Sequence, residues 1–174
     1  MRSTASAMVA ARAADTVAVL GAPAPADAAL AAEIALITGL NGRTLVIDVG
    51  TDARARVEAA AAKAGALVEF EWAPVTMLPI DADAFDVAVI NRQLAALDGR
   101  NRVACCEEAL RIIKKPGGRV VVIEGVKRPG LFGLIPSRLP GIDPEQVKDA
   151  LTRAGARAVR QLADVDGVAF FEAK

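Results

Sequence analysis

The sequence contains no histidine and no tyrosine, and its only two cysteines are neighbours, Cys105 and Cys106. Without histidine the chain lacks the commonest metal ligand and the usual general base near neutral pH. Two cysteines cannot build a Cys/His zinc site, and adjacent cysteines are poorly placed for an ordinary structural disulfide. We therefore expect no metal site, no conventional catalytic residue, buried unreactive thiols and a reducing, cytoplasmic location.

Long apolar runs and an excess of one charge are also absent. No run approaches the ~20 residues that a membrane-spanning helix requires. Basic and acidic side chains balance at 21 each, which argues against a nucleic-acid-binding surface, so we expect no nucleic-acid partner. The balance differs between halves, because residues 1–90 hold 6 basic and 11 acidic side chains and residues 91–174 hold 15 and 10. Solvated helix faces are the simplest explanation of this asymmetry.

Short runs rich in valine and isoleucine alternate with alanine-rich helical stretches along most of the chain. An apolar fraction of 53% allows a substantial core. The predicted strands are residues 16–20, 44–48, 67–71, 85–90 and 119–124, and the predicted helices are residues 26–38, 53–64 and 100–114. Continuous Val/Ile runs indicate strands that are buried on both faces. This repetition of strand and helix predicts a doubly wound α/β domain.

The C-terminal region predicts an antiparallel addition to the sheet. Asp143 and Pro144 suit the N-cap and the first position of a helix. Residues 156–162 and 168–172 are predicted strands, and the short Asp/Gly turn between them pairs them in antiparallel fashion.

No internal repeat, low-complexity tract or interdomain linker divides the chain. Arg12 and Asp15 interrupt any signal-peptide core near the N-terminus. We therefore expect residues 1–15 to form a lead segment and residues 16–174 to form a single domain.

Two segments carry recognisable motifs: residues 78–89 (LPIDADAFDVAV) and residues 108–120 (EALRIIKKPGGRV). They resemble the LPF-x-D-x-x-FD-x-V passage and the E-x-x-R-x-L-K-P-G-G helix and turn of the class I S-adenosylmethionine-dependent methyltransferases, especially the small-molecule kind. The resemblance covers roughly residues 16–172. It implies a Rossmann-like, mostly parallel sheet of seven strands, with helices on both faces and an antiparallel C-terminal strand pair.

The resemblance also implies S-adenosylmethionine as the cofactor, but the chain departs from the family where that cofactor binds. The family's glycine-rich loop corresponds to residues 19–25 (VLGAPAP), where only Gly21 survives, and Pro23 and Pro25 replace glycines. Proline fixes φ and removes an N–H donor, so this loop does not cradle the ligand in the usual way. Pro74 stands where the family has its adenine-binding acid.

Of the other implied cofactor contacts, the ribose-binding position is better preserved. Asp48 holds the position of the ribose-binding acid, and its two oxygens suit two vicinal hydroxyls, although a strand-end Asp is equally a turn residue. Trp72 can stack on adenine, but a tryptophan beside a sheet is more often core, and core is our prediction. Asn91 follows the fourth strand, where the family's residues face the transferred methyl group, or it simply ends a strand. The implied cofactor-binding residues are Gly21, Ala22, Asp48, Val49, Val75 and Asn91.

Residues 127–141 (KRPGLFGLIPSRLPG) form a long loop after the fifth predicted strand. The loop mixes apolar side chains with cations. It either covers a hydrophobic substrate, docks a protein partner, touches an anionic membrane surface or packs over the sheet edge. The candidate substrate or partner residues are Arg128, Leu131, Phe132, Leu134 and Ile135.

Two functions from different classes fit this pattern. In the first, the chain is a methyltransferase-like protein with a degenerate S-adenosylmethionine site, weak or no cofactor binding, and an interaction or assembly role. In the second, it is an active methyltransferase for a small or hydrophobic acceptor, and catalysis is mostly positioning for in-line displacement. The prolines favour the first. The sequence leaves the acceptor, the partner and the oligomeric state open.

Overall fold

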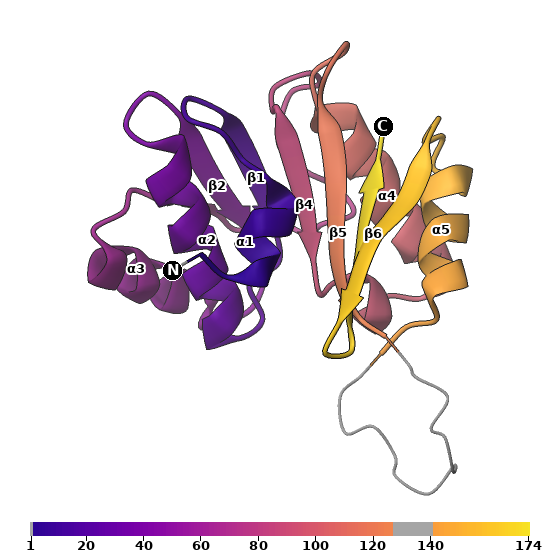
Figure 1. Cartoon of the computed structure of the whole chain (residues 1–174), viewed down its shortest axis with the longest axis horizontal. Helices are drawn as coiled ribbons and strands as arrows, with labels where there is room; N and C mark the ends of the chain where they lie inside the picture. Colours follow the sequence, from indigo (N-terminus) through magenta and orange to yellow (C-terminus); the bar gives the residue numbers. More distant parts are fainter. Residues whose placement is uncertain (1, 127–140) are drawn as a thin grey trace, which may run out of the picture.

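A seven-stranded sheet lies between two layers of helices in the computed structural model, which describes residues 2–126 and 141–174 (Figure 1). The strands are β1 (Thr16–Leu20), β2 (Arg43–Ile47), β3 (Glu69–Glu71), β4 (Val87–Asn91), β5 (Arg119–Gly125), β6 (Val159–Val165) and β7 (Val168–Ala173). The helices are α1 (Thr4–Val9), α2 (Pro25–Thr38), α3 (Ala53–Ala64), α4 (Gly99–Ile112) and α5 (Pro144–Arg153), with a short 3₁₀ helix η1 (Leu94–Ala96). No helix among the described residues is long and apolar enough to cross a membrane.

The strand order is β3-β2-β1-β4-β5-β7-β6, and this order confirms the predicted fold class. The strands β1 to β5 are parallel, whereas β7 runs antiparallel to both of its neighbours. The chain builds outward from β1 to β3 and then returns to place β4 beside β1. This reversal makes the carboxyl ends of β1 and β4 the switch point of the sheet, the position at which open α/β sheets usually hold their ligand crevice.

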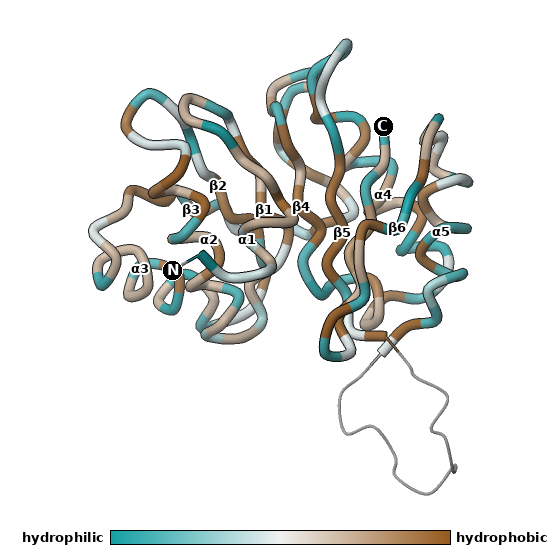
Figure 2. Tube along the Cα trace, in the orientation of Figure 1, coloured by the Kyte–Doolittle hydropathy of each residue, from teal (hydrophilic) through white to brown (hydrophobic). Residues whose placement is uncertain are grey.

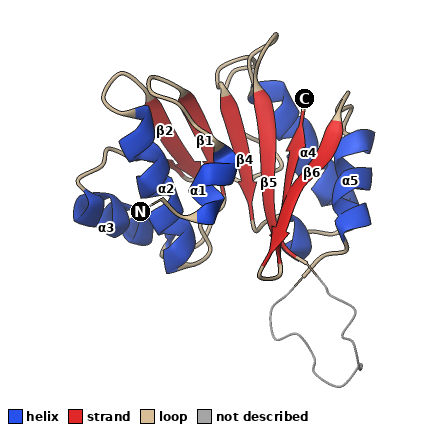
Figure 3. Ribbon diagram, viewed as in Figure 1, coloured by secondary structure: helices blue, strands red, loops and turns tan. Residues whose placement is uncertain are grey.

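The central strands are buried on both faces, as their unbroken Val/Ile runs predict. Every residue of β4 is buried, and the middle strands are the brownest part of the chain in Figure 2. The helices α1 and α2 lie on one face of the sheet, and α4 and α5 lie on the other (Figure 3). Side chains of each pair pack into the apolar core of their own face. Asp143 caps α5 by accepting a hydrogen bond from the Glu145 backbone, with Pro144 at the first helical position, as predicted.

The two edge strands differ most from the sequence-based prediction. The strand β3 spans Glu69–Glu71 rather than residues 67–71, and β6 spans Val159–Val165 rather than residues 156–162. An edge strand pairs on one side only and buries less apolar surface, so its sequence carries a weaker pattern. A bulge between Gln161 and Ala163 further disturbs the alternation in β6.

The two family-like motifs contact each other in the structure. The mixture of apolar and charged residues over residues 100–114 predicts that Glu108 and Arg111 face outward from the helix. This prediction is wrong, because both side chains turn toward the irregular segment before β4. Glu108 accepts a hydrogen bond from the Leu78 backbone at 2.6 Å and pairs with Arg111 at 2.7 Å. Arg111 also donates to the carbonyl oxygens of Ile80 and Leu78 at 2.6 and 3.1 Å. Residues 78–80 of this segment lie in no strand, and the side chains of Glu108 and Arg111 supply hydrogen-bond partners for their backbone.

Asp86 joins three elements at the amino ends of the parallel strands. Its Oδ2 accepts hydrogen bonds from the backbone N–H and the hydroxyl of Thr16 at 2.8 and 2.7 Å. Lys114, just beyond α4, donates to both carboxylate oxygens at 2.9 Å. Burial opposes ionisation of Asp86, but the hydrogen bonds from Thr16 and Lys114 outweigh it and hold its pKa below the usual value.

We predict that Asp86→Asn destabilises the fold by about 1–3 kcal/mol, because an amide nitrogen then faces Lys114 or the Thr16 donors. Urea unfolding followed by circular dichroism measures the change. Asp81→Asn, which changes an exposed turn carboxylate in the same motif, is the matched control and should cost less than about 0.5 kcal/mol. Equal stability of the two variants would contradict the assigned role of Asp86.

Candidate functional site

Three of the predicted cofactor residues meet at the crevice between the parallel strands. Gly21 follows β1, Asp48 follows β2, and Asn91 ends β4. Because parallel strands end at the same edge of a sheet, these three residues come together although 70 positions of the chain separate the first from the last. The three residues therefore lie together at the carboxyl edge of the sheet. Whether this edge can bind a ligand depends on how many of its polar groups are already hydrogen-bonded within the protein.

Asp48 uses both carboxylate oxygens within the protein. Oδ2 accepts a hydrogen bond from the backbone N–H of Ala22 at 2.7 Å, and Oδ1 accepts one from the backbone N–H of Gly50 at 2.6 Å. The residue is only 9% exposed. The carboxylate thus joins the loop after β1 to the loop after β2, which is the turn role that the sequence left open.

The backbone donors of the loop after β1 are all accounted for. Gly21 N donates to the Ile47 carbonyl at 2.9 Å, Ala22 N to Asp48, and Ala24 N to the Asp27 carboxylate at 3.0 Å. Pro23 and Pro25 have no N–H. Within the described structure, residues 21–25 therefore retain no backbone N–H that lacks an internal acceptor.

The space beside Gly21 is filled by the segment that follows β4. Gly21 has a φ of +97°, and a Cβ built on it would lie 2.0 Å from Nε2 of Gln93 and 2.7 Å from the Asn91 carbonyl oxygen. Only glycine fits such a close approach. Asn91 donates from Nδ2 to the Gly21 carbonyl at 3.1 Å, and its buried Oδ1 has no hydrogen-bond partner among the described residues.

Further contacts hold these loops against the helices. Arg92, in the left-handed region at φ 52°, pairs with the buried Asp27 in the first turn of α2 at 3.2 Å. Arg56 of α3 donates to the Ala22 carbonyl at 3.3 Å. The loops after β1, β2 and β4 are therefore cross-linked to one another and to two helices.

Glu124, near the end of β5, is a buried acid that sequence reasoning missed. It is 1% exposed, and its Oε1 accepts a hydrogen bond from the Leu94 backbone at 2.5 Å, which holds η1 in place. Burial raises its pKa to about 7, against the opposing backbone hydrogen bonds of η1 and the nearby Arg92. The signal in the sequence is an acid that closes an otherwise apolar strand, RVVVIEG.

The residues implied for the adenine end lie in contrasting surroundings. Val49 is 48% exposed and Trp72 is 63% exposed, whereas Val75 is buried with the core that faces α4. The prediction that Trp72 is core was wrong. The residue follows the edge strand β3, beyond the last paired position, where no helix covers it.

The cysteines, metal-ligating side chains and the loop over residues 127–141 are the remaining candidates from the sequence. Cys105 and Cys106 are free and buried, as expected; burial raises the pKa of Cys106 to about 12 and that of Cys105 well above its ordinary value. No cluster of three metal-ligating side chains occurs in residues 2–126 and 141–174. The loop candidates Arg128, Leu131, Phe132, Leu134 and Ile135 lie outside the described residues and stay predictions.

A cavity of about 410 Å³ lies next to this edge, between α1, the start of α2 and the carboxyl ends of β4 and β5. Its polar lining includes Asp27, Asn91 and Arg92, and its apolar lining includes Ile123 and Phe170. An apolar cavity with a few polar groups has the general character of a small-molecule site.

Comparison with known proteins shows which family the chain resembles. A family model described as a methyltransferase domain matches residues 27–122, which is more than half of the chain. No match to a curated protein sequence was found.

The solved structures that resemble the chain share its fold at low sequence identity. A SAM-dependent methyltransferase from Aquifex aeolicus has a TM-score of 0.69 and 20% identity, covering 93% of this chain and 81% of that one. The [4+2]-cyclase SpnF has a TM-score of 0.71 and 17% identity, covering 97% and 76%. A chain from the complex between the Haloferax volcanii Trm112 methyltransferase activator and a methyltransferase has a TM-score of 0.66 and 18% identity, covering 97% and 86%.

We predict that Asp48→Asn lowers the free energy of unfolding by about 1–3 kcal/mol, because the new amide nitrogen faces a backbone N–H donor in a buried site. Urea unfolding without any ligand measures the change. Asp52→Asn is the control, since Asp52 lies exposed in the same loop and its side chain makes no capping hydrogen bond. If Asp48→Asn were as stable as the control, Asp48 would have no structural role.

The raised pKa of Glu124 predicts that the free energy of unfolding depends on pH. Its pKa is about 7 in the folded protein and has an ordinary value of 4.5 in the unfolded chain, so between these values only the folded state retains the proton. The free energy of unfolding should therefore decrease as pH rises from about 4.5 to about 7, by at most about 3 kcal/mol at about 1.4 kcal/mol per pH unit.

Glu124→Gln, which stays neutral, should flatten this part of the profile when urea unfolding is repeated across the pH range. Glu107→Gln, an exposed change on α4, should leave the slope as in the parent chain. An unchanged slope in Glu124→Gln would show that another group titrates there.

Proposed function

The chain belongs to the methyltransferase domain family, and from this premise we propose that it is a methyltransferase-like protein with little or no affinity for S-adenosylmethionine and an interaction or assembly role. One observation carries the proposal. The donors and acceptors that the family offers to the cofactor are hydrogen-bonded within this protein, at Asp48 and along residues 21–25.

The ribose end illustrates the energetic obstacle. A ribose diol would have to reach the remaining lone pairs of a carboxylate that is only 9% exposed and already accepts two backbone N–H bonds, at 2.7 and 2.6 Å. If a hydroxyl reached an oxygen only by displacing one of these N–H groups, the displaced donor would be left unsatisfied, at a cost of about 1–3 kcal/mol. Such a cost would lower the affinity of the protein for the cofactor by the same amount.

The methionine end meets a second obstacle. Its charged groups would approach a loop in which Pro23 and Pro25 offer no donor and in which the Gln93 side chain fills the space beside Gly21. S-adenosylmethionine would supply an electrophilic methyl group if bound, and Asp48 and Asn91 are the residues of this chain best placed to hold it.

Two of the similar structures support the proposal at the level of the fold. SpnF is a [4+2]-cyclase, and another similar chain is found in a complex with the Haloferax volcanii Trm112 methyltransferase activator. Function depends on the site that a fold carries, and in this chain Asp48 and the backbone N–H groups of residues 21–25 bond within the protein.

Active methyl transfer to a small or hydrophobic acceptor is the second candidate, and two observations favour it. Val49 and Trp72 present exposed apolar surface at the ends of neighbouring strands, where a planar ring could lie. The 410 Å³ cavity beside Asn91 has room for a small acceptor.

Calorimetric titration with S-adenosylhomocysteine, the product of such transfer, separates the two candidates. We expect no heat of binding at ligand concentrations of about 1 mM, which bounds the affinity at weaker than about 4 kcal/mol. Micromolar binding that is lost in Asp48→Ala and kept in Asp52→Ala would overturn the proposal in favour of an active cofactor site.

A variant designed to gain binding tests whether the altered loop is the reason for an absence of S-adenosylhomocysteine binding. Pro23→Gly/Pro25→Gly/Gln93→Ala restores two N–H donors and removes the amide beside Gly21. We expect this variant to bind the same ligand more tightly than the parent chain does.

A further inference from the structure

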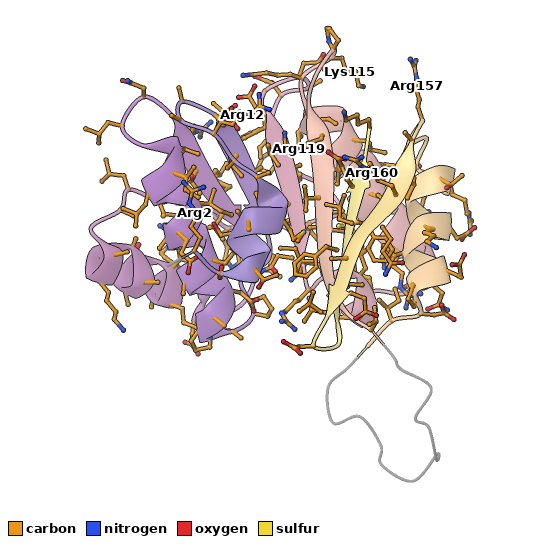
Figure 4. The ribbon with its side chains drawn as sticks, viewed as in Figure 1. Arg2, Arg12, Lys115, Arg119, Arg157 and Arg160 are labelled. Carbon is orange, nitrogen blue, oxygen red and sulfur yellow. The ribbon has the colours of Figure 1, made fainter. Side chains whose placement is uncertain are left out.

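Cationic side chains gather at the amino edge of the sheet, opposite to the site described above. Figure 4 shows Arg12, Lys115, Arg119, Arg157 and Arg160 around the amino end of β5 and the neighbouring part of β6, while Arg2 lies apart. We name these five residues the amino-edge cluster. All except Arg119 are exposed.

Hydrogen bonds and ion pairs place Arg119 and Arg160 near each other and near the segment of Arg12. Arg119 donates from Nη2 to the carbonyl oxygens of Val9 and Ala10 at 2.8 Å, which brings it close to the segment that carries Arg12. Glu172 on β7 lies between two arginines: it is 3.7 Å from Arg119 and 2.5 Å from Arg160. One carboxylate therefore serves two guanidinium groups, and the local charge stays positive.

Lys115 and Arg157 line the two sides of a cavity of about 750 Å³ between the ends of α4 and α5. The cavity is also lined by Arg111 and Lys114, whose charges are paired with Glu108 and Asp86, and by Lys174 and Glu107. Among the described residues no hydrogen bond or ion pair engages the side chains of Lys115, Arg157 or Arg12. Exposed cations that no carboxylate neutralises, beside a concave surface, favour an anionic partner.

The composition of the surface distinguishes between kinds of anionic partner. The centre of a protein interface usually holds apolar or aromatic anchors. In the described residues the exposed large apolar side chains belong to other segments: Leu36, Leu40, Val49, Leu67, Trp72, Met77 and, at the far end of β6, Val165. A flat bilayer surface does not match cations that line a cavity. A chain of phosphate groups needs only cations, and the guanidinium fork matches phosphate well.

We propose that the amino-edge cluster binds the phosphodiester backbone of a single nucleic-acid strand. The expectation of no nucleic-acid partner rested on the net charge of the whole chain. The fold instead brings four cations of residues 91–174 and Arg12 to one edge of the sheet. The cluster holds no aromatic side chain, so bases have nothing to stack on and binding is independent of sequence. The proposal does not depend on whether S-adenosylmethionine binds.

Fluorescence anisotropy of a labelled oligouridylate of about 12 nucleotides tests the proposal. We expect a dissociation constant in the micromolar range at about 50 mM NaCl, with a log–log salt slope near −3 for about four phosphate contacts. Lys115→Glu/Arg157→Glu should weaken binding by about tenfold or more.

Lys63→Glu/Arg100→Glu is the matched control, because it reverses two exposed cations on α3 and α4 and changes the net charge equally. This control should bind within about threefold of the parent chain. Circular dichroism confirms that both variants fold. Equal weakening in the two variants, no binding at about 50 mM NaCl, or binding only to phosphatidylglycerol vesicles or polyglutamate would overturn the proposal.

Discussion

Asp86 accepts hydrogen bonds from the first residue of β1 and from Lys114 beyond α4, and this carboxylate fixes where β1 and β4 begin relative to each other. The two strands are neighbours only because the chain reverses direction across the sheet after β3. With their amino ends held in register, their carboxyl ends finish at the same level. Gly21, Asp48 and Asn91 meet at the crevice for this reason, whatever they then bind.

At that crevice, stability and ligand binding draw on the same polar groups. A backbone N–H that donates to Asp48 stabilises the loops and is no longer offered to a ligand. The prolines act in the same direction, since they stiffen the loop after β1 and remove donors from it. The loops at this edge share a hydrogen-bond network, in which Glu124 and the Arg92–Asp27 pair hold the segment after β4.

The two edges of the sheet have opposite chemical characters. At the carboxyl edge, buried polar groups bond to one another across three loops. At the amino edge, arginines and a lysine remain in solvent, and Glu172 alone lies between Arg119 and Arg160. Exposed cations cost little while they are hydrated, so this edge keeps a charge that a partner can use.

Local periodicity, composition and propensity are enough to predict the α/β class, the central strands, the cap of α5 and the burial of Cys105 and Cys106. Four other features follow from the folded arrangement alone: the partners of Asp48, the exposure of Trp72, the inward turn of Glu108 and Arg111, and the shared edge of cations distant in sequence. Hydrogen-bond partners and desolvation depend on residues that are far apart along the chain, and a one-dimensional pattern carries no record of those distances.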